Sequence, residues 1–280
     1  MLDYKIRTFL KVCETMNYRR AAEELNMSQP SITQHIQALE QYYNCKLFIY
    51  DRKHLLKTEQ AKILEHYSLS MRANERSLIN ELIKIPKREI RIGATKSIGN
   101  YVINDKIKEF YDNYKLTFVI DNTHNLLSLL EKNKLDILLI EGLFDKSHYD
   151  YKLYKREKFV GICAKDSSIA NKNISFSSLT KQPLILREKG SGTREIFEQE
   201  LRKNSYSINQ FESIASISSF EYILDFVEKN KGISFVFESV SNTRENIANF
   251  SVEDTSIERE FNFVYLKNTN LDWIIDLFLV

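Results

Sequence analysis

Two helix-start signals close together, at Asn17 and at Ser28, constrain the N-terminal fold most strongly. Asn17 can cap a helix over residues 18–25, whose two small alanines would let a neighbouring helix approach closely. Ser28 offers a second cap, and Pro30 follows in the first helical turn, where its missing N–H costs nothing. Because only a short turn separates these helices, the segment predicts a helix-turn-helix unit.

The flanking segments complete this unit. Residues 4–16 place apolar side chains on one stripe at helical spacing, which predicts a first helix: Ile6, Phe9, Leu10, Val12 and Cys13. In the third helix, which we expect to reach about residue 43, Ile32, Ile36 and Leu39 recur at helical spacing and should point into the core. Residues 47–58 are predicted to form a two-stranded wing.

A long helix is expected next. Thr58 can cap a segment without glycine or proline that reaches Ile85 and would be about 40 Å long. Residues at spacings of three and four mark one face of this helix: Ile63, Tyr67, Ser70 or Met71, Asn74, Leu78, Leu82 and Ile85. A partner helix from a second chain is the expected cover, although the polar Ser70 and Asn74 leave a monomeric surface helix open.

From residue 88 the pattern changes to apolar runs that alternate with amphipathic helices, which is typical of an α/β fold with parallel sheets. The first series holds EIRIGAT, a helix over 98–114, TFVIDN, a helix near 126–133 and LDILLIEG. The second holds FVGICAK, PLILRE, a helix over 193–204, FESIAS, a helix near 219–230 and GISFVFES. The last strand and helix, NFVYLK and 271–279, could return to the first lobe.

The charge and the cysteine content limit the classes of protein to which this chain can belong. The net charge is only +2, but residues 1–58 hold nine Lys or Arg against six Asp or Glu. The three cysteines are far apart and show no CxxC pairing, so neither a disulfide framework nor a zinc site is indicated. No leader or long apolar run is apparent, so we expect a cytoplasmic protein that does not associate with membranes.

The segment NYRRAAEELNMSQPSITQHIQALE, with its paired alanines and its Ser-Gln-Pro, resembles the LysR family of transcriptional regulators, and the resemblance runs the full length of the chain. It implies a winged helix-turn-helix over 1–58, a linker and dimerisation helix over 59–87 and a two-lobed effector domain like the periplasmic binding proteins over 88–280. The first lobe would comprise about 88–157 and 261–280, and the second about 158–260. The chain departs from the family pattern at Asn44 and Ala61, where glycine is usual, and at Tyr50, where arginine is usual.

The third helix should carry the contacts with double-stranded DNA. Its outward side chains can exchange hydrogen bonds with base edges or phosphates in the major groove, and the nearby cations can meet phosphates. The candidate DNA-binding residues are Arg19, Gln29, Pro30, Ser31, Thr33, Gln34, Gln37, Arg52 and Lys53. For the polar residues, a solvated side chain without a DNA contact is the alternative.

A second match, LREKGSGTRE with VIDNT and LLIEG, resembles the family branch that includes regulators of sulfur assimilation and of carbon dioxide fixation. Here a strand leads into a glycine-containing loop and then at once into a helix, so backbone N–H groups and the helix dipole would favour an anion. The candidate residues on this wall are Gly190, Ser191, Gly192 and Thr193. The motif lacks the Gly-Lys-Ser/Thr ending of a Walker loop.

The opposite wall of the cleft should contain Thr95 and Ser97, between a strand and a helix of the first lobe. Family resemblance adds Asn122, Thr123, Glu141, Ser218 and Phe220, for which helix capping is the alternative role. Glu141 would oppose an anion unless the ligand also has a hydrogen-bond donor. The expected effector is therefore a small anionic metabolite bound between the lobes.

Other classes of function are less well supported. No nucleophile, base and orienting group occur at recognisable spacing, and neither a metal site nor a cofactor is indicated, so we do not expect an enzyme. A two-lobed binding protein without a transcriptional role is the alternative function, but an exported solute-binding protein would need a leader and would not begin with a helix-turn-helix. Redox sensing by a cysteine has little support, because Cys13 and Cys163 fall in apolar elements.

The resemblance also implies an assembly and a mechanism. Two chains would pair through the long helix and present their recognition helices to an interrupted dyad, and sensor domains would join dimers into a homotetramer. A ligand would change the angle between the lobes, and so the spacing of the DNA-binding dimers, the bend of the DNA and the recruitment of RNA polymerase.

Overall fold

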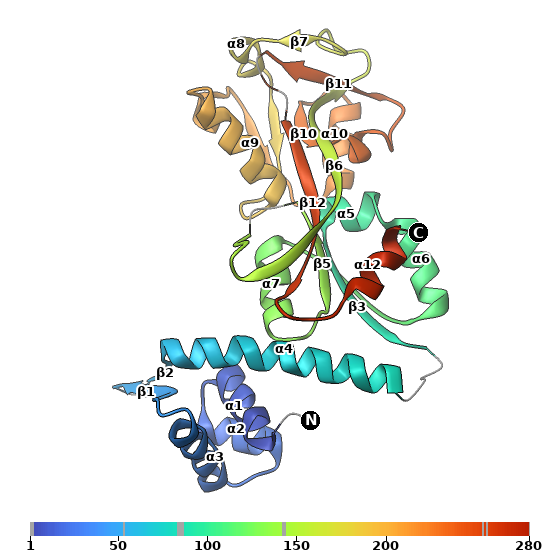
Figure 1. Cartoon of the computed structure of the whole chain (residues 1–280). Helices are drawn as coiled ribbons and strands as arrows, with labels where there is room; N and C mark the ends of the chain where they lie inside the picture. The colour runs from blue at the N-terminus through green and yellow to red at the C-terminus, as the bar shows by residue number, and fades with distance from the viewer. Residues whose placement is uncertain are drawn as a thin grey trace.

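The computed structural model describes residues 3–52, 54–82, 87–141, 144–253, 255 and 257–279. Figure 1 shows three parts: a small helical unit, one long helix and a domain of two lobes. The long helix runs between the helical unit and the first lobe, and the second lobe lies farthest from the helical unit. Among the described residues, no helix combines the length and the apolar character needed to cross a membrane.

The N-terminal unit is the predicted helix-turn-helix. It consists of α1 (Tyr4–Thr15), α2 (Tyr18–Leu25) and α3 (Gln29–Tyr42). Both predicted caps form, since Asn17 accepts a hydrogen bond from the N–H of Arg20 and Ser28 accepts one from the N–H of Ser31. The predicted inward side chains of α1 and α3 are all buried.

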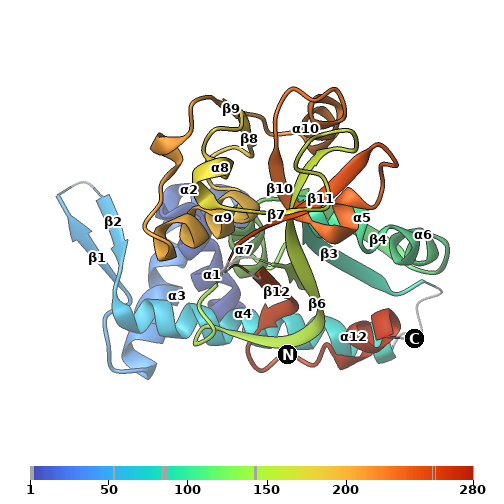
Figure 2. The same ribbon diagram turned by 90° about the horizontal axis from the view of Figure 1, so that it is seen from above.

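The predicted wing follows. Its strands β1 (Phe48–Asp51) and β2 (His54–Lys57) pair in antiparallel fashion and project from one side of the molecule (Figure 2). Asn44, in the turn before the wing, has φ 48°, a left-handed conformation that asparagine tolerates better than most residues. This explains why asparagine can stand where glycine is usual. Ala61, after the wing, is fully buried.

The long helix α4 (Glu59–Leu82) begins as predicted, because the Thr58 hydroxyl accepts a hydrogen bond from the N–H of Ala61. Ile85, the last position of the predicted face, lies outside the described residues. Of the two polar positions on that face, Ser70 is buried, and Asn74 bonds to the backbone of Asn268 and Asn270 in the first lobe. These polar residues therefore belong to contacts within the chain.

The first lobe holds parallel strands in the order β4-β3-β5: β3 (Glu89–Thr95), β4 (Lys115–Asp121) and β5 (Ile137–Ile140). Its helices are α5 (Lys96–Tyr101), α6 (Asn104–Asn113), α7 (Thr123–Glu131) and α12 (Asp272–Leu279). The prediction of one helix over 98–114 was wrong. Ile103 leaves helical geometry, with φ −109° and ψ 12°, and buries its side chain in the core, so the helix divides into α5 and α6.

Two long antiparallel strands, β6 (Tyr149–Ala164) and β12 (Ile257–Leu266), run from one lobe into the other (Figure 1). They make the main sheet continuous, with the order β4-β3-β5-β12-β6-β11-β7 and β10 paired with β6. The expected parallel pairing holds for β3, β4 and β5, and for β8 with β9, but it is wrong around β6, whose partners β10, β11 and β12 are all antiparallel.

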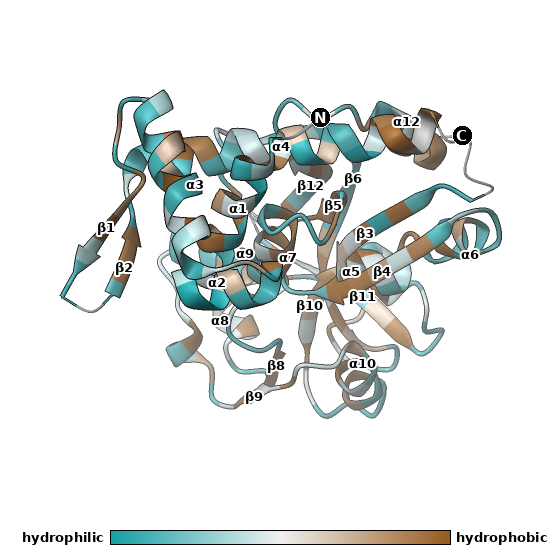
Figure 3. Ribbon diagram, turned by 90° about the horizontal axis from the view of Figure 1, so that it is seen from below, coloured by the Kyte–Doolittle hydropathy of each residue, from teal (hydrophilic) through white to brown (hydrophobic). Residues whose placement is uncertain are grey.

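The second lobe comprises the remaining elements. Its strands are β7 (Asn173–Ile174), β8 (Leu184–Leu186), β9 (Ile214–Ser216), β10 (Ser234–Phe237) and β11 (Ile247–Val252). Its helices are α8 (Phe176–Leu179), α9 (Gly192–Lys203), η1 (Ile208–Gln210), α10 (Phe220–Glu228) and α11 (Glu238–Ser241). Figure 3 shows hydrophobic residues along the strands inside the lobes and more hydrophilic residues along outer helices such as α2 and α6.

Helix α4 is attached to the first lobe by a cluster of charged groups. Asp136, which precedes β5, accepts hydrogen bonds from Arg76 of α4 and from Arg91 of β3. Arg91 also donates to the backbone and side-chain oxygens of Asn133 at 2.6 and 3.0 Å. The Asp136 side chain is 7% exposed, so water screens this contact little.

We predict that Asp136→Asn lowers the free energy of unfolding by about 3 kcal/mol, because it leaves two neighbouring guanidinium groups without their shared counter-ion. The thermal unfolding midpoint of the full-length chain measures this loss. Asp105→Asn is the matched control, since Asp105 pairs with Lys108 on the surface and its side chain is 95% exposed. The control should change stability by less than about 0.5 kcal/mol, and equal effects of the two substitutions would contradict the role of Asp136.

Candidate DNA interface and effector cleft

Helix α3 presents a polar outer face. Gln29, Pro30, Gln34 and Gln37 are exposed, while the apolar side chains of the opposite face hold the helix against α1. Ser31 and Thr33 are half-buried, and their hydroxyls make local hydrogen bonds to Ser28 and to the Gln29 carbonyl. The exposed glutamines are therefore the α3 side chains with the most freedom to meet base edges.

The candidate phosphate contacts lie on either side of α3 in the sequence. Arg19, on α2, is highly exposed, and its guanidinium forms an ion pair with Glu23 at 3.1 Å, one helical turn away. Arg52 is exposed at the tip of the wing and adopts a positive φ of 53°. Lys53, the other predicted contact in the wing, lies outside the described residues.

On the first lobe, Thr95 ends β3 and Ser97 lies in the first turn of α5, and both are buried. Their hydroxyls donate hydrogen bonds to the two carboxylate oxygens of Glu141, which follows β5. Burial raises the pKa of Glu141, and the hydrogen bonds from Thr95 and Ser97 only partly oppose this increase. The three predicted residues thus form one cluster, in which the hydroxyls are directed to a carboxyl group of the chain.

The residues predicted for the opposite wall lie in the loop between β8 and α9. Gly190 has φ 86°, a conformation that favours glycine, and Gly192 begins α9. Ser191 and Thr193 are buried, and their hydroxyls lie 2.8 Å apart. The Ser191 side chain makes no capping hydrogen bond to the first turn of α9, so this 12-residue helix presents its N-terminal end without a side-chain cap.

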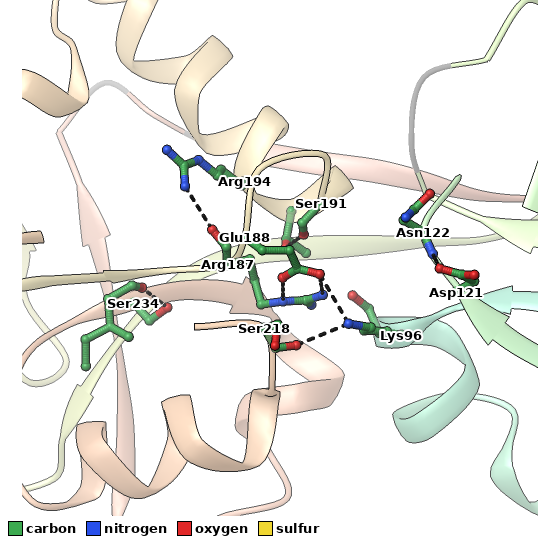
Figure 4. Close-up of polar contacts among 12 residues, drawn as sticks. Lys96, Asp121, Asn122, Arg187, Glu188, Ser191, Arg194, Ser218 and Ser234 are labelled. Atoms are coloured by element: carbon green, nitrogen blue, oxygen red, sulfur yellow. Dashed lines mark hydrogen bonds and ion pairs between the residues drawn. The ribbon is translucent and has the colours of Figure 1, made fainter. Parts of the chain in front are cut away.

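A network of charged side chains connects the two lobes (Figure 4). Lys96, at the start of α5, donates hydrogen bonds to the Glu188 carboxylate and to the Ser218 carbonyl, both at 3.2 Å. Arg187 donates to both oxygens of the same carboxylate, at 2.8 and 3.0 Å. Burial alone would raise the pKa of Glu188, but the hydrogen bonds and charge of Arg187 outweigh it and hold the pKa below its ordinary value.

The remaining predicted residues divide between this network and a separate position. The buried Phe220 lies beneath the Arg187 guanidinium, with 4.3 Å from Cζ to the ring centroid, and Ser218 contributes its carbonyl. Asn122 caps α7 and lies beside Asp121, apart from the network in Figure 4. The buried hydroxyl of Thr123 has no hydrogen-bond partner within the described part of the chain. The structure therefore brings Ser218 and Phe220 to the network but not Asn122.

Sequence reasoning missed Lys96, Arg187 and Glu188, although all three lie within motifs it singled out. A local signal was present: Lys96 and Arg187 come directly after buried strands, and Glu188 is the next residue, at the carboxyl end where open α/β sheets bind ligands. What the sequence did not show is that Lys96 and Glu188, from different lobes, pair with each other.

Two of the three cysteines, Cys13 and Cys163, are buried. Burial raises the pKa of Cys13 and of Cys163, which disfavours a reactive thiolate at either position. In the ranges that the structure describes, no group of three or more His, Cys, Asp or Glu residues could hold a metal ion.

The chain matches known families over almost its whole length. Residues 4–62 match the family described as bacterial regulatory helix-turn-helix protein, lysR family. Residues 85–279 match the family described as LysR substrate binding domain.

Three similar proteins illustrate the relationship. The HTH-type transcriptional regulator CysL of Bacillus subtilis is 27% identical over 282 residues, which cover 94% of this chain and 92% of that protein. The RuBisCO operon transcriptional regulator of Allochromatium vinosum is 24% identical over 278 residues, covering 95% and 90%. The Synechocystis CcmR regulatory domain, solved in complex with 2-PG, has a TM-score of 0.60 at 19% identity and covers 69% of this chain and 94% of that one. The relatives agree with the branch that the sequence motifs indicated.

We predict that Glu141 makes stability depend on pH. Because its pKa is raised in the folded chain, the folded state binds more protons than the unfolded state at pH values above the ordinary glutamate pKa. The free energy of unfolding therefore falls as the pH rises through this window. Glu141→Gln lacks this titration, so its stability relative to the unsubstituted chain should increase between pH 5 and pH 8. Thermal unfolding at both pH values measures the difference, and a difference independent of pH would contradict the assignment.

Proposed function

The chain belongs to the LysR family of bacterial DNA-binding regulators, and we propose that it acts as a homodimer controlled by a small anionic metabolite bound between its two lobes. Helix α3 would enter the major groove, and the two-lobed domain would sense the metabolite. The main support for DNA recognition by α3 is its outer face. Gln29, Gln34 and Gln37 are exposed there, while the other face of the helix is buried. The chain is accordingly a regulator rather than an enzyme.

In this proposal, each of the three parts of the structure has its own function. Residues 1–58 bind DNA, residues 59–87 form the linker and dimerisation helix, and residues 88–280 bind the effector. The glutamines of α3 read base edges, whereas Arg19 and Arg52 contact phosphates, with Lys53 included on sequence grounds. Pro30, Ser31 and Thr33 shape and support the start of the recognition helix.

A second copy of the chain is the proposed cover for α4. Five large apolar side chains on this helix are half or more exposed, at spacings that put them near one stripe: Ile63, Tyr67, Met71, Leu78 and Leu82. A stripe of this length on a surface helix is typical of a helix that packs against a partner. Tetramers made through the effector domains, recruitment of RNA polymerase and a cytoplasmic location complete the proposal by family resemblance.

The anionic class of the effector rests on the charges between the lobes. Lys96 and Arg187 supply two cations at the meeting point of the lobes, close to the uncapped start of α9. The CcmR regulatory domain, which has a similar fold, binds 2-PG. Glu141 opposes an anion less than an exposed glutamate would, because its raised pKa favours the neutral form.

We predict that Gln37→Ala and Arg19→Ala weaken DNA binding in different ways. Loss of a base-edge contact at Gln37 should reduce discrimination between the preferred sequence and its variants by about 1–3 kcal/mol. Loss of a phosphate contact at Arg19 should weaken binding to all sequences and reduce the slope of log affinity against log salt by about 1. Fluorescence anisotropy on duplexes from upstream of the chain's own gene measures both.

The control for these substitutions is Gln60→Ala, which removes an exposed glutamine from α4 outside the proposed DNA interface. It should leave affinity, specificity and salt dependence unchanged. DNA affinity that does not respond to salt, or a footprint without dyad symmetry, would contradict the proposed mode of binding.

We predict that Met71→Glu disrupts the dimer. The substitution places a charge in the middle of the α4 stripe, where pairing of two chains would bury it without a partner. Size-exclusion chromatography with light scattering should show a lower mass at equal concentration, whereas Met71→Leu, which conserves volume and apolar character, should keep the dimer. Equal masses for both variants would show that chains do not pair through this stripe.

A further inference from the structure

The Glu188 carboxylate lies between two cations that come from opposite lobes (Figure 4). Arg187 Nε and Nη2 donate to its two oxygens at 2.8 and 3.0 Å, which is the bidentate arrangement that guanidinium groups form with free carboxylates and phosphates. Lys96 Nζ reaches one of these oxygens at 3.2 Å from the first lobe. The position of the carboxylate is therefore that of an anion bound by both lobes.

Arg187 needs an anion at this position. The residue is only 5% exposed, and its guanidinium is held over the Phe220 ring, so little water can solvate its charge. In the part of the chain that the structure describes, Glu188 is the carboxylate that forms an ion pair with it. A buried guanidinium that loses its directly bonded carboxylate is strongly destabilised, so the departure of Glu188 favours the entry of another anion.

Glu188 is the more accessible partner of this ion pair. Its side chain is 32% exposed, much more than that of Arg187, and it is attached to the loop that precedes α9, where Gly190 adopts a positive φ. On swinging outward, the carboxylate would be solvated by water. The neighbouring residues Ser191 and Thr193 lie at the uncapped N-terminal end of α9 and would add donors to an anion that entered.

We propose that Glu188 is a built-in competitor of the effector: it occupies the anion site made by Arg187 and Lys96 in the unliganded chain, and an incoming oxyanion displaces it. The ligand class is a small molecule with a carboxylate, sulfate or phosphate group that can accept the bidentate contact of Arg187. This inference deepens the proposed function and rests on it, since it concerns the same space between the lobes.

Competition of this kind sets the concentration at which the protein responds. Because the effector must displace Glu188 from Arg187 and Lys96, its apparent dissociation constant is higher than it would be for the same site without the competing carboxylate. The lobes remain connected in both states, because Lys96 and Arg187 exchange one anion for another. The response is thus shifted toward high metabolite concentrations without loss of the contact between lobes.

The test is isothermal titration of the full-length chain with sodium sulfate and with inorganic phosphate, at constant ionic strength. Removal of the competitor by Glu188→Gln should increase the affinity for at least one of these anions about tenfold, which corresponds to about 1.4 kcal/mol. Lys96→Met, which removes the cation of the other lobe, should decrease that affinity about tenfold. Because Lys96 is partly exposed on the first lobe, this variant tests the site independently of the Glu188 loop.

Glu200→Gln is the matched control. Glu200 is a glutamate of the same lobe, and its side chain pairs with Lys203 on α9, so the substitution changes the net charge by the same amount away from the site. It should leave the affinity for both anions unchanged. An equal gain from Glu200→Gln would mean that only the overall charge matters and would overturn the proposal.

Two further outcomes distinguish this inference from the proposed function. If the unsubstituted chain binds an anion and Glu188→Gln binds it no better, Glu188 is a structural ion pair and the inference fails, while the anionic effector stands. If neither sulfate nor phosphate binds any variant, the anion site itself is overturned. The proposal that the chain binds DNA through α3 stands under either result, and DNA binding can be measured on the same preparations.

Discussion

The contact on which the rest of the structure depends is the ion cluster at Asp136. One carboxylate holds Arg76 of the linker helix and Arg91 of the first lobe, so the helix that follows the DNA-binding unit and the sheet that carries one wall of the cleft share a counter-ion. Neutralising this group would leave two cations facing each other in a place with little water. The first lobe is thereby fixed to α4. A movement between lobes must then be expressed as a movement of the second lobe relative to α4 and the helix-turn-helix.

The two carboxylates between the lobes behave differently because their surroundings differ. Glu141 is fully buried, and burial outweighs the hydrogen bonds from Thr95 and Ser97 and the weaker influence of the Arg187 charge, so its pKa rises. Glu188 is met by a guanidinium and an ammonium group, so its charged form is stabilised and its pKa falls. The space between the lobes thus combines a carboxyl group whose pKa is raised with one whose pKa is lowered and which accepts hydrogen bonds from a cation of each lobe. Only the second can compete with an anionic ligand.

The sequence predicted best those features that depend on neighbours along the chain. The caps at Asn17, Ser28 and Thr58 and the wing are local, and the structure contains all of them. Long-range pairing was harder: nothing near β6 indicates that this strand crosses both lobes and pairs in antiparallel fashion with β12, because that pairing joins segments about a hundred residues apart. The division of the helix over 98–114 at Ile103 likewise follows from burial in a core that the sequence pattern alone does not define. The same reason explains the missed pair Lys96 and Glu188, whose contact exists only once the two lobes meet.

The central claim is that an anion between the lobes changes how the chain binds DNA. The most direct measurement is the affinity of the full-length chain for duplex DNA from upstream of its own gene, at constant ionic strength, as sulfate replaces chloride. The account predicts a change of about fivefold or more in DNA affinity for the unsubstituted chain, in line with typical coupling between sites, whereas Lys96→Met should need about tenfold more sulfate for the same change. The same response in both proteins, or no response in either, would contradict it.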